Sequence, residues 1–497
     1  MDMSNYPAAV AILNSLQSNA ATIAQLRASG HPDYSLALPE MVEWLAQAGY
    51  QPRLLDKLNI VHVAGTKGKG STSAFISSIV GQYLSPGRTR QPIRVGLFTS
   101  PHLRFVRERI QIDNMPISEP HFATQFFQLL HKFKEDKRPM YFRFLTLMAF
   151  QTFLQENVEA AVVECGIGGE YDSTNIIQKP VVTAITSLGI DHESLLGHTL
   201  PEIAWHKAGI FKPGAVALTV PQPAEAMAVL QQRAQERECK LVIIPRHPQI
   251  ESGQVSLGLA ADYQKTNASI AVASASALLK KMGFSQVPDL VSNPAAALPK
   301  EFIAGLQKVR WPGRSEVRAE TSTNTMWFLD GAHTVESIEL STQWFITETK
   351  KQGKDIPRVL IFNQQSRDAD KLATALYDMA SKTLGPRPFD KVIFTTNKTY
   401  ETHGYTPDLV SNNTDNKSVE DLTVQDQLAR TWGHLDPTAA IEVCRSIDSA
   451  ILRARSLNAT AATAESSQRL VLIIGSLHLV GGALEVLENA ANNTLER

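Results

Sequence analysis

Short apolar runs alternate with longer stretches of helical periodicity along most of the chain. Strands that alternate with amphipathic helices are typical of a parallel sheet covered by helices. The pattern therefore predicts an α/β fold with two successive sheets. The expected strands of the first sheet are 58–64, 94–99, 159–164 and 181–188, and those of the second are 326–329, 359–362, 391–394 and 470–474.

Two polar segments and the N-terminal region interrupt this alternation. Residues 1 to about 50 have apolar positions at helical spacing and are expected to be helical. The segment 285–315 is rich in Pro, Ala and Asn, which places a domain boundary close to Trp311–Arg314 and predicts domains at 1–313 and 314–497. Residues 400–432 are polar, with a turn-like run at 411–413, and are expected to form a long surface loop.

Composition narrows the classes of function. At 497 residues the chain can hold two or three domains, and its net charge of -1 gives no general attraction to nucleic acid. Three cysteines provide neither a disulfide framework nor a metal-ligand spacing, which fits a reducing compartment. No apolar run approaches the roughly 20 residues of a transmembrane helix. Met1–Gln25 lacks arginine and does not resemble a transit peptide, so we expect a cytoplasmic protein; a mitochondrial pool would require an alternative start.

A glycine-dense run, Val61–Thr72, lies between an expected strand and an expected helix. Glycines let backbone N–H groups point into one concavity, and the start of a helix adds partial positive charge. A lysine in this position can reach the β- and γ-phosphates of a nucleotide. Val63 and Gly70 depart from the common P-loop pattern, and a strand-to-helix turn with surface lysines is the plain alternative. The run predicts binding of a nucleoside triphosphate.

Three polar residues follow expected strands and are candidate ligands of a metal ion. Glu164 ends one strand, and Ser100 and His192 come just after two others. Ligands bind at the carboxyl ends of strands in open α/β sheets, and a carboxylate suits Mg²⁺. Taken singly, each residue is also explained as a surface Glu, a Ser-Pro turn or a solvated loop His.

Further charged residues stand at turns. Lys207 lies in the last turn of a helix that opens with a capping box at Thr199, where a surface lysine would also complement the helix dipole. Asp330 follows an expected strand in an Asp-Gly turn, and Arg314 offers a bidentate fork for phosphate at the expected boundary. Plain turn residues remain the alternative for both.

Taken together, these segments resemble the folylpolyglutamate synthase family, the folate branch of the Mur ligase superfamily, in its eukaryotic form. The likeness is weakest at 215–300 and 395–465. The matching runs are Ala64–Thr72, Phe98–Leu103, Arg107–Ile110, Phe142–Thr146, Glu164–Asn175, Asp191–His192, His206–Gly209, Trp311–Arg314, Asp330–His333 and Gly475–Gly481.

The resemblance implies an N-terminal P-loop ATPase domain and a smaller Rossmann-like C-terminal domain, with ATP and Mg²⁺ as cofactors and a monovalent cation as a further candidate. The substrates it implies are folate, glutamate and ATP, and we expect a monomer. Glu170 stands where many bacterial relatives have Arg. By correspondence, Gly68, Lys69, Gly70 and Ser71 bind phosphates, Ser100, Glu164 and His192 bind Mg²⁺, Arg314 and Asp330 contact the nucleotide, Lys69, Lys207 and His333 are catalytic, and Lys207 is carbamylated and holds a second Mg²⁺.

The implied reaction is the ATP-dependent joining of glutamate to the γ-carboxylate of a folate through an acyl phosphate. Dihydrofolate synthase, which uses the same chemistry on dihydropteroate, is one alternative. A P-loop kinase or ATPase without an amino-acid acceptor is another, and a non-catalytic nucleotide-binding scaffold is a third.

Overall fold

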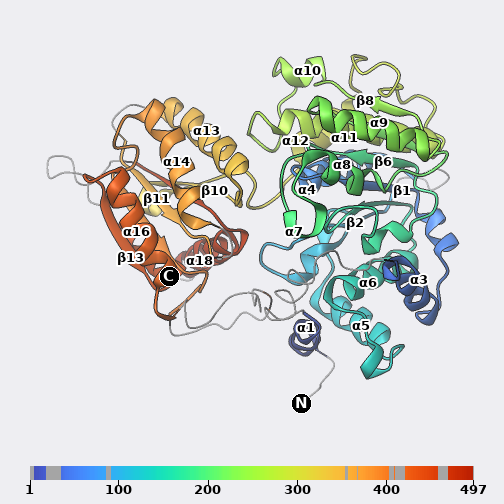
Figure 1. Ribbon diagram of the computed structural model, residues 1–497, viewed down its shortest axis with the longest axis horizontal. Helices are drawn as coiled ribbons and strands as arrows, with labels where there is room; N and C mark the ends of the chain where they lie inside the picture. The colour runs from blue at the N-terminus through green and yellow to red at the C-terminus, as the bar shows by residue number, and fades with distance from the viewer. Residues whose placement is uncertain are drawn as a thin grey trace. The chain divides into compact units, whose positions relative to one another are not determined.

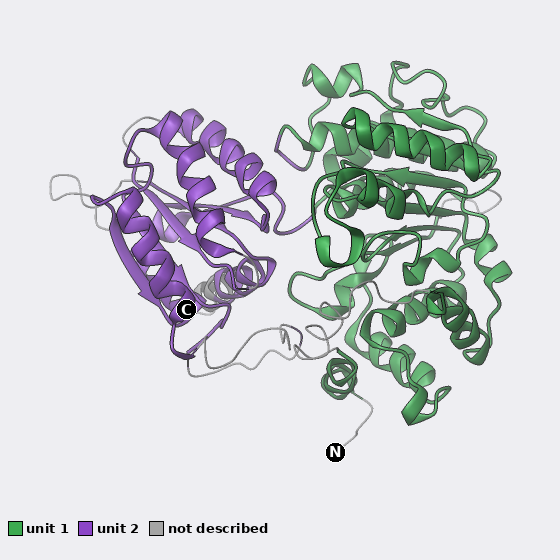
Figure 2. Ribbon diagram, in the orientation of Figure 1, with its two compact units in different colours: residues 1–258, 262–310 green, residues 259–261, 311–497 purple. Residues whose placement is uncertain are grey.

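The chain forms two compact units in a computed structural model (Figures 1 and 2). The first contains residues 1–258 and 262–310, and the second contains 259–261 and 311–497. The boundary after residue 313 that the sequence suggests stays a prediction. The structure describes residues 5–17, 35–85, 91–352, 356–365, 368–401, 408, 420–456 and 468–495.

An eight-stranded sheet forms the centre of the first unit, in the order β4-β3-β2-β5-β1-β6-β7-β8. The six strands from β2 to β8 run parallel, and β3 and β4 are antiparallel additions at one edge. The strands are β1 (Ile60–Ala64), β2 (Val95–Phe98), β3 (Ile110–Ile112), β4 (Met115–Pro116), β5 (Ala160–Glu164), β6 (Val182–Ile185), β7 (Val216–Thr219) and β8 (Leu241–Ile243).

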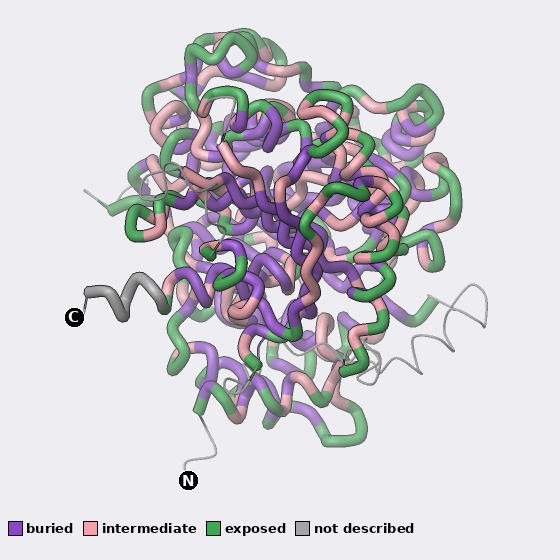
Figure 3. The backbone as a smooth tube through the Cα atoms, turned by 90° about the vertical axis from the view of Figure 1, so that its left-hand side faces the viewer, coloured by how far each residue is buried: buried purple, intermediate pink, exposed green. Residues whose placement is uncertain are grey.

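Helices cover both faces of this sheet. On one face α4 packs against α11 and α12, while α8 and α9 pack together on the other, beside the apolar cluster that includes α1, α3, α5 and α6. Every residue of β1, β2, β5 and β6 is buried, as the purple segments of the interior illustrate (Figure 3). The helices are α1 (Tyr6–Ser15), α3 (Ala37–Gln47), α4 (Lys69–Val80), α5 (Glu119–Leu130), α6 (Tyr141–Gln155), α7 (Glu193–Leu196), α8 (Leu200–Ala208), α9 (Ala224–Glu236), α10 (Pro248–Glu251), α11 (Gln264–Lys281) and α12 (Lys300–Lys308).

The second unit contains a six-stranded sheet in the order β13-β12-β11-β14-β10-β9, parallel except for β9 at one edge. The four strands expected here are present, and the sequence analysis missed β9 and β13. The elements are β9 (Glu316–Glu320), β10 (Thr325–Asp330), α13 (Val335–Gln352), β11 (Arg358–Phe362), α14 (Ala369–Leu384), β12 (Lys391–Thr395), α16 (Thr423–Leu435), β13 (Ala440–Cys444), α17 (Ile447–Arg455), β14 (Arg469–Ile474) and α18 (Leu477–Leu495).

The prediction of a surface loop at 400–432 was wrong for the C-terminal part of this range. Helix α16 begins at Thr423, and it buries Gln425, Leu428 and Trp432 on one face. Spacings of three and four residues place these side chains on one stripe, while the polar residues that dominate the composition occupy the exposed face. The turn expected at 411–413 lies outside the described residues.

Candidate functional site

The glycine-rich turn joins β1, the strand between β5 and β6, to the start of α4. After β1 the chain continues to β2, which lies towards one edge of the sheet. It later returns through β5 and passes β1 to form β6, which lies towards the other edge. The turn therefore lies at the carboxyl end of a parallel sheet where the strand order reverses, which is where open α/β sheets bind ligands. Gly68 is the N-cap of α4, so Lys69, Gly70 and Ser71 form the first helical turn.

Two glycines of this turn have positive φ, +146° at Gly65 and +86° at Gly68. A Cβ atom at Gly65 would clash with the Thr186 side chain, and one at Gly68 would clash with the Asn267 side chain. The turn is also fixed to the segment after β6, because the amides of Thr66 and Lys67 both donate to the carbonyl of Ser187 at 3.0 Å. Backbone conformation and close packing both require glycine here.

Two lysine side chains meet inside the turn. The Nζ of Lys69 lies 3.1 Å from the carbonyl oxygen of Gly65, and the Nζ of Lys207 lies 2.8 Å from the same oxygen. Lys207 is only 3% exposed. Burial, followed by the charge of Lys69, lowers the pKa of Lys207 to about 7. The structure thus brings together two lysines that are 138 positions apart in sequence by numbering, and it keeps one of them largely dehydrated.

Helix α8 places Lys207 in this position. Its N-cap Thr199 forms the expected capping box with Glu202, and Lys207 lies in its last turn before Gly209. The loop after β5 packs on the end of this helix, because a Cβ atom at Gly169 would lie 2.7 Å from the carbonyl oxygen of Lys207. The amide of Glu170 donates to the carbonyl of His206 at 2.7 Å.

The candidate metal ligands follow strands β2, β5 and β6. The backbone amide of Ser100 donates to Oε2 of Glu164 at 3.1 Å, so these two residues are adjacent. His192 has a left-handed backbone, φ 55°, and its amide donates to the carboxylate of Asp191 at 2.9 Å. That carboxylate also pairs with Lys67 at 3.0 Å. Strand β1 lies between β5 and β6, so Glu164 and His192 follow strands that are not neighbours in the sheet.

The donor set fits a magnesium ion of the kind that keeps several waters. Glu164 is a buried carboxylate, 3% exposed, at the end of β5. The hydroxyl of Ser100 follows β2, which is next to β5, and the imidazole of His192 follows β6, which is next to β1. Mg²⁺ is bound by one or two carboxylates together with substrate phosphates. Within the described ranges, no group of three or more His, Cys, Asp or Glu gathers to hold a metal ion, so a cage built from protein alone is absent there.

Two residues that the sequence analysis missed support the turn from α11. Gln264 donates to the Ser71 hydroxyl at 3.3 Å, and Asn267 donates to Gln264 at 2.9 Å. The Asn267 side chain is also the one that a Cβ atom at Gly68 would meet. Both side chains are buried. The sequence offered no local signal for them, because α11 is otherwise a helix of small apolar residues almost 200 positions away.

Glu170 forms an ion-pair cluster with α9. Its carboxylate pairs with Arg233 and, at 2.6 Å, with Arg237. The guanidinium of Arg233 lies 4.5 Å from the centre of the Trp205 ring on α8. In this chain Glu170 therefore joins the loop after β5 to α8 and α9.

In the second unit, Arg314, Asp330 and His333 come together at the end of β10. The Asp330 carboxylate accepts hydrogen bonds from the amide of Ser315 at 2.7 Å and from the Ser341 hydroxyl at 2.9 Å. A Cβ atom at Gly331 would lie 2.7 Å from the guanidinium of Arg314. The Nδ1 of His333 lies 2.7 Å from the carbonyl oxygen of Gly331. Asp330 thus fixes the turn that carries Arg314.

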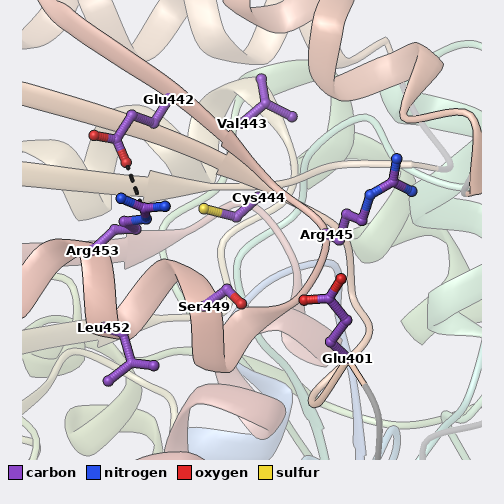
Figure 4. Close-up of a pocket in the computed structure, with 8 residues that line it drawn as sticks. All are labelled: Glu401, Glu442, Val443, Cys444, Arg445, Ser449, Leu452 and Arg453. Carbon is purple, nitrogen blue, oxygen red and sulfur yellow. Dashed lines mark ion pairs between the residues drawn. The ribbon is translucent and has the colours of Figure 1, made fainter.

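A separate hollow of about 530 Å³ lies at the end of β13 in the second unit (Figure 4). Glu442 in its lining is compensated from within the unit, since it pairs with Lys391 at 2.7 Å and lies 3.9 Å from Arg453. Burial, followed by the charge of Glu442, raises the pKa of the Cys444 thiol, which makes it a poor nucleophile.

The sheets and the glycine-rich turn define a two-domain α/β protein of the Mur ligase type. No family model matches the chain. Individual relatives do match. A folylpolyglutamate synthase of Saccharomyces cerevisiae (strain FostersO) is 45% identical over 498 residues, which cover 97% of this chain and 87% of the relative. The chain therefore belongs to the folylpolyglutamate synthase family.

Solved structures agree with this fold. Mycobacterium tuberculosis folylpolyglutamate synthase complexed with ADP superposes with a TM-score of 0.69 at 25% identity, covering 97% of this chain and 99% of that one. The apo form of the L. casei enzyme gives a TM-score of 0.67 at 22% identity, with 97% and 100% coverage. No helix among the described residues is long and apolar enough to cross a membrane.

Proposed function

We propose that the chain is an ADP-forming ligase that joins L-glutamate to the γ-carboxylate of a folate or folylglutamate. Membership of the family supports this activity, and so does the convergence of Lys69 and Lys207 on the carbonyl of Gly65 at the carboxyl end of the sheet. This convergence is the observation that carries the proposal, because it puts two cationic or proton-accepting groups where a nucleotide's terminal phosphates would lie.

The reaction requires activation of a carboxylate, which is a poor electrophile at neutral pH. An oxygen of the folate γ-carboxylate attacks the γ-phosphorus of ATP, the bond to the β–γ bridging oxygen breaks, and ADP leaves. The amine of glutamate then attacks the acyl carbon, inorganic phosphate leaves, and the amine loses a proton. Lys69 neutralises the charge that develops on the phosphoryl oxygens, and the backbone amides of Gly68 to Ser71 orient them.

We further propose that Ser100, Glu164 and His192 hold Mg²⁺. The bound ion would neutralise phosphate charge. Lys207 is proposed to be carbamylated: its neutral amine adds to CO₂, a C–N bond forms, and a proton is released. The burial of Lys207 supports this step, since burial favours the neutral amine and shields the product from water. The resulting anion would hold a second Mg²⁺.

The remaining parts of the proposal concern residues of the second unit, the oligomeric state and the cellular compartment. Arg314 is proposed to contact the nucleotide and His333 to be catalytic, while Asp330 holds the turn that carries Arg314. We propose a monomer in the cytoplasm, in line with three free cysteines, Cys165, Cys239 and Cys444. A monovalent cation is a further proposed cofactor, and a potassium titration of activity tests it.

One assay tests the activity against its alternatives. The purified protein is incubated with ATP, Mg²⁺ and glutamate, together with either tetrahydrofolate or dihydropteroate, and both ADP and the product mass are measured. ADP release that requires tetrahydrofolate and glutamate, with one added glutamate in the product, supports the proposal. Turnover with dihydropteroate alone indicates dihydrofolate synthase, and ADP release without glutamate indicates a kinase or ATPase.

A further inference from the structure

A short turn that contains two arginines lies a few residues after the candidate metal ligand Ser100. The 3₁₀ turn Val106–Arg109 contains Arg107 and Arg109, and the backbone carbonyl of Arg109 accepts a hydrogen bond from Thr99 at 3.0 Å. Since Thr99 precedes Ser100, and Ser100 donates to Glu164, the turn borders the carboxyl end of the central sheet. These arginines have no role in the proposed mechanism so far.

Among the residues that the structure describes, neither guanidinium is paired with a carboxylate. Arg109 is only 9% exposed, and its Nε donates to Nδ1 of His102 at 2.9 Å. Arg107 donates to the carbonyl of Ile117 at 3.3 Å, and its Nε is buried without a hydrogen-bond acceptor. Across the described ranges, no Asp or Glu lies within ion-pair distance of either residue. Other arginines of this unit do pair with carboxylates: Arg94, Arg143, Arg233 and Arg237.

The nearest acidic residue, Glu108, is already used by the backbone. Its carboxylate accepts hydrogen bonds from the amides of Leu103 at 2.8 Å and of Phe105 at 3.1 Å. Aromatic rings hold the guanidiniums instead, because Arg107 lies 5.1 Å from the centre of the Phe105 ring and Arg109 lies 5.3 Å from that of Tyr141. A partly buried charge is normally matched by an opposite charge, so the turn has the composition of an anion-binding site.

We propose that Arg107 and Arg109 bind the free α-carboxylates of the γ-linked glutamate chain on the acceptor substrate. This inference rests on the proposed function, because only that function supplies an acceptor whose negative charge grows with each turnover. A γ-glutamyl chain carries one α-carboxylate per residue, and the planar guanidinium fork matches a carboxylate in a bidentate manner. Because Ser100 is a proposed ligand of the Mg²⁺ ion, a chain held by this turn would lie at the same edge of the sheet as that ion, and the arginines are not part of the nucleotide loop.

The test combines side-chain and substrate changes. Arg107→Gln and Arg109→Gln are assayed with pteroyltriglutamate and with the same compound whose α-carboxylates are amidated. Wild type is expected to lose about tenfold or more in kcat/KM on amidation, as for loss of a charged hydrogen bond. The variants start lower by a similar factor and lose little more on amidation. The conservative variants Arg107→Lys and Arg109→Lys should recover part of the lost activity. The KM for ATP should be the same in all of these variants as in wild type.

Arg143→Gln is the matched control. Arg143 also lies over an aromatic ring, 5.3 Å from the centre of Trp44, but pairs with Glu40 at 2.6 Å. It should respond to amidation as wild type does. Equal losses on amidation in wild type and in both glutamine variants would overturn the proposal, and so would a raised KM for ATP, which would make phosphate the bound anion.

Failure of the proposed function has a different signature. In that case wild type adds no glutamate to the unmodified triglutamate, before any variant is compared. Equilibrium binding of the free and amidated triglutamates to wild type and to Arg109→Gln then tests the arginine site independently of turnover. The site is supported if wild type binds the unmodified triglutamate more tightly than the amidated one and Arg109→Gln binds the two equally. It is refuted if both proteins bind both triglutamates with the same affinity.

Discussion

Acidification should destabilise the first unit through His62, a fully buried residue of β1. Its Nε2 lies 2.8 Å from the Thr174 hydroxyl and 3.1 Å from the Cys165 sulfur, and its Nδ1 is buried without a hydrogen-bond partner. Burial, followed by the charge of Lys212, lowers the pKa of His62 to about 3. The imidazole is therefore neutral in the folded protein at every pH at which the enzyme is handled.

The magnitude follows from proton linkage. Between about pH 3 and pH 6.5 the unfolded chain binds a proton at His62 and the folded chain does not, so stability falls as the pH falls below 6.5. The loss is about 1.4 kcal/mol for each pH unit, or about 2 kcal/mol at pH 5. At pH 5 the loss of stability depends only on the pKa of His62 in the unfolded chain, since its pKa in the folded protein lies well below pH 5.

Neighbouring groups set the remaining pH dependence. Burial raises the pKa of the Asp172 carboxyl, which stabilises the protonated form and so opposes the effect of His62 on acidification. Burial also keeps the Cys165 thiol neutral by raising its pKa. Because both groups are retained when His62 is replaced, the difference between wild type and a His62 variant isolates the imidazole.

The assay is hydrogen exchange in peptides that cover β1 and β5, measured with increasing denaturant near pH 7.5 and pH 5, since it reports on the first unit alone. Wild type should lose about 2 kcal/mol more than His62→Gln over this range. His198→Gln is the control, because that side chain is 77% exposed and its removal should leave the pH dependence nearly unchanged. Parallel losses in wild type and His62→Gln would show that the imidazole is not held neutral.

Three other predictions concern residues that are proposed to act on the nucleotide or on Mg²⁺. Lys69→Ala should lower kcat by at least about 10²-fold with an unchanged melting temperature, and near wild-type turnover would refute the assignment of the loop. Lys207→Ala should be inactive and regain activity with small carboxylates, whereas an experimental map with a bare ammonium at Lys207 in the Mg²⁺-bound enzyme would exclude carbamylation. Arg314→Ala should weaken binding of ATP more than binding of folate in calorimetry, and equal losses would point to disruption of the turn that Asp330 holds.

Strand positions in the centre of each sheet could be predicted because these buried strands are apolar at most positions. The run at 181–188 was longer than β6, Val182–Ile185, because the carbonyl of Ser187 accepts the amides of the glycine-rich turn. Edge strands escaped notice for the opposite reason. Strand β9, for instance, has no buried position and carries charged residues at Glu316, Arg318 and Glu320.

The candidate site divides in the same way between local and long-range features. Glycine spacing and strand ends are local, so Gly68, Lys69 and Glu164 could be recognised in sequence. The shared carbonyl of Gly65, and the support from Gln264 and Asn267, depend on packing between distant elements. Charge compensation is equally invisible in sequence, so the run Arg107–Ile110 could be matched to the family while its arginines received no role.

The Glu170 cluster constrains which segments can be exchanged between branches of the family. A loop graft that brings Arg to position 170 would set a third guanidinium against Arg233 and Arg237, with Glu236 left to neutralise them. Repulsion would then act on the same loop that packs against the carbonyl of Lys207. The loop after β5 and helix α9 should therefore be exchanged together, so that a chimeric protein takes both segments from the same parent.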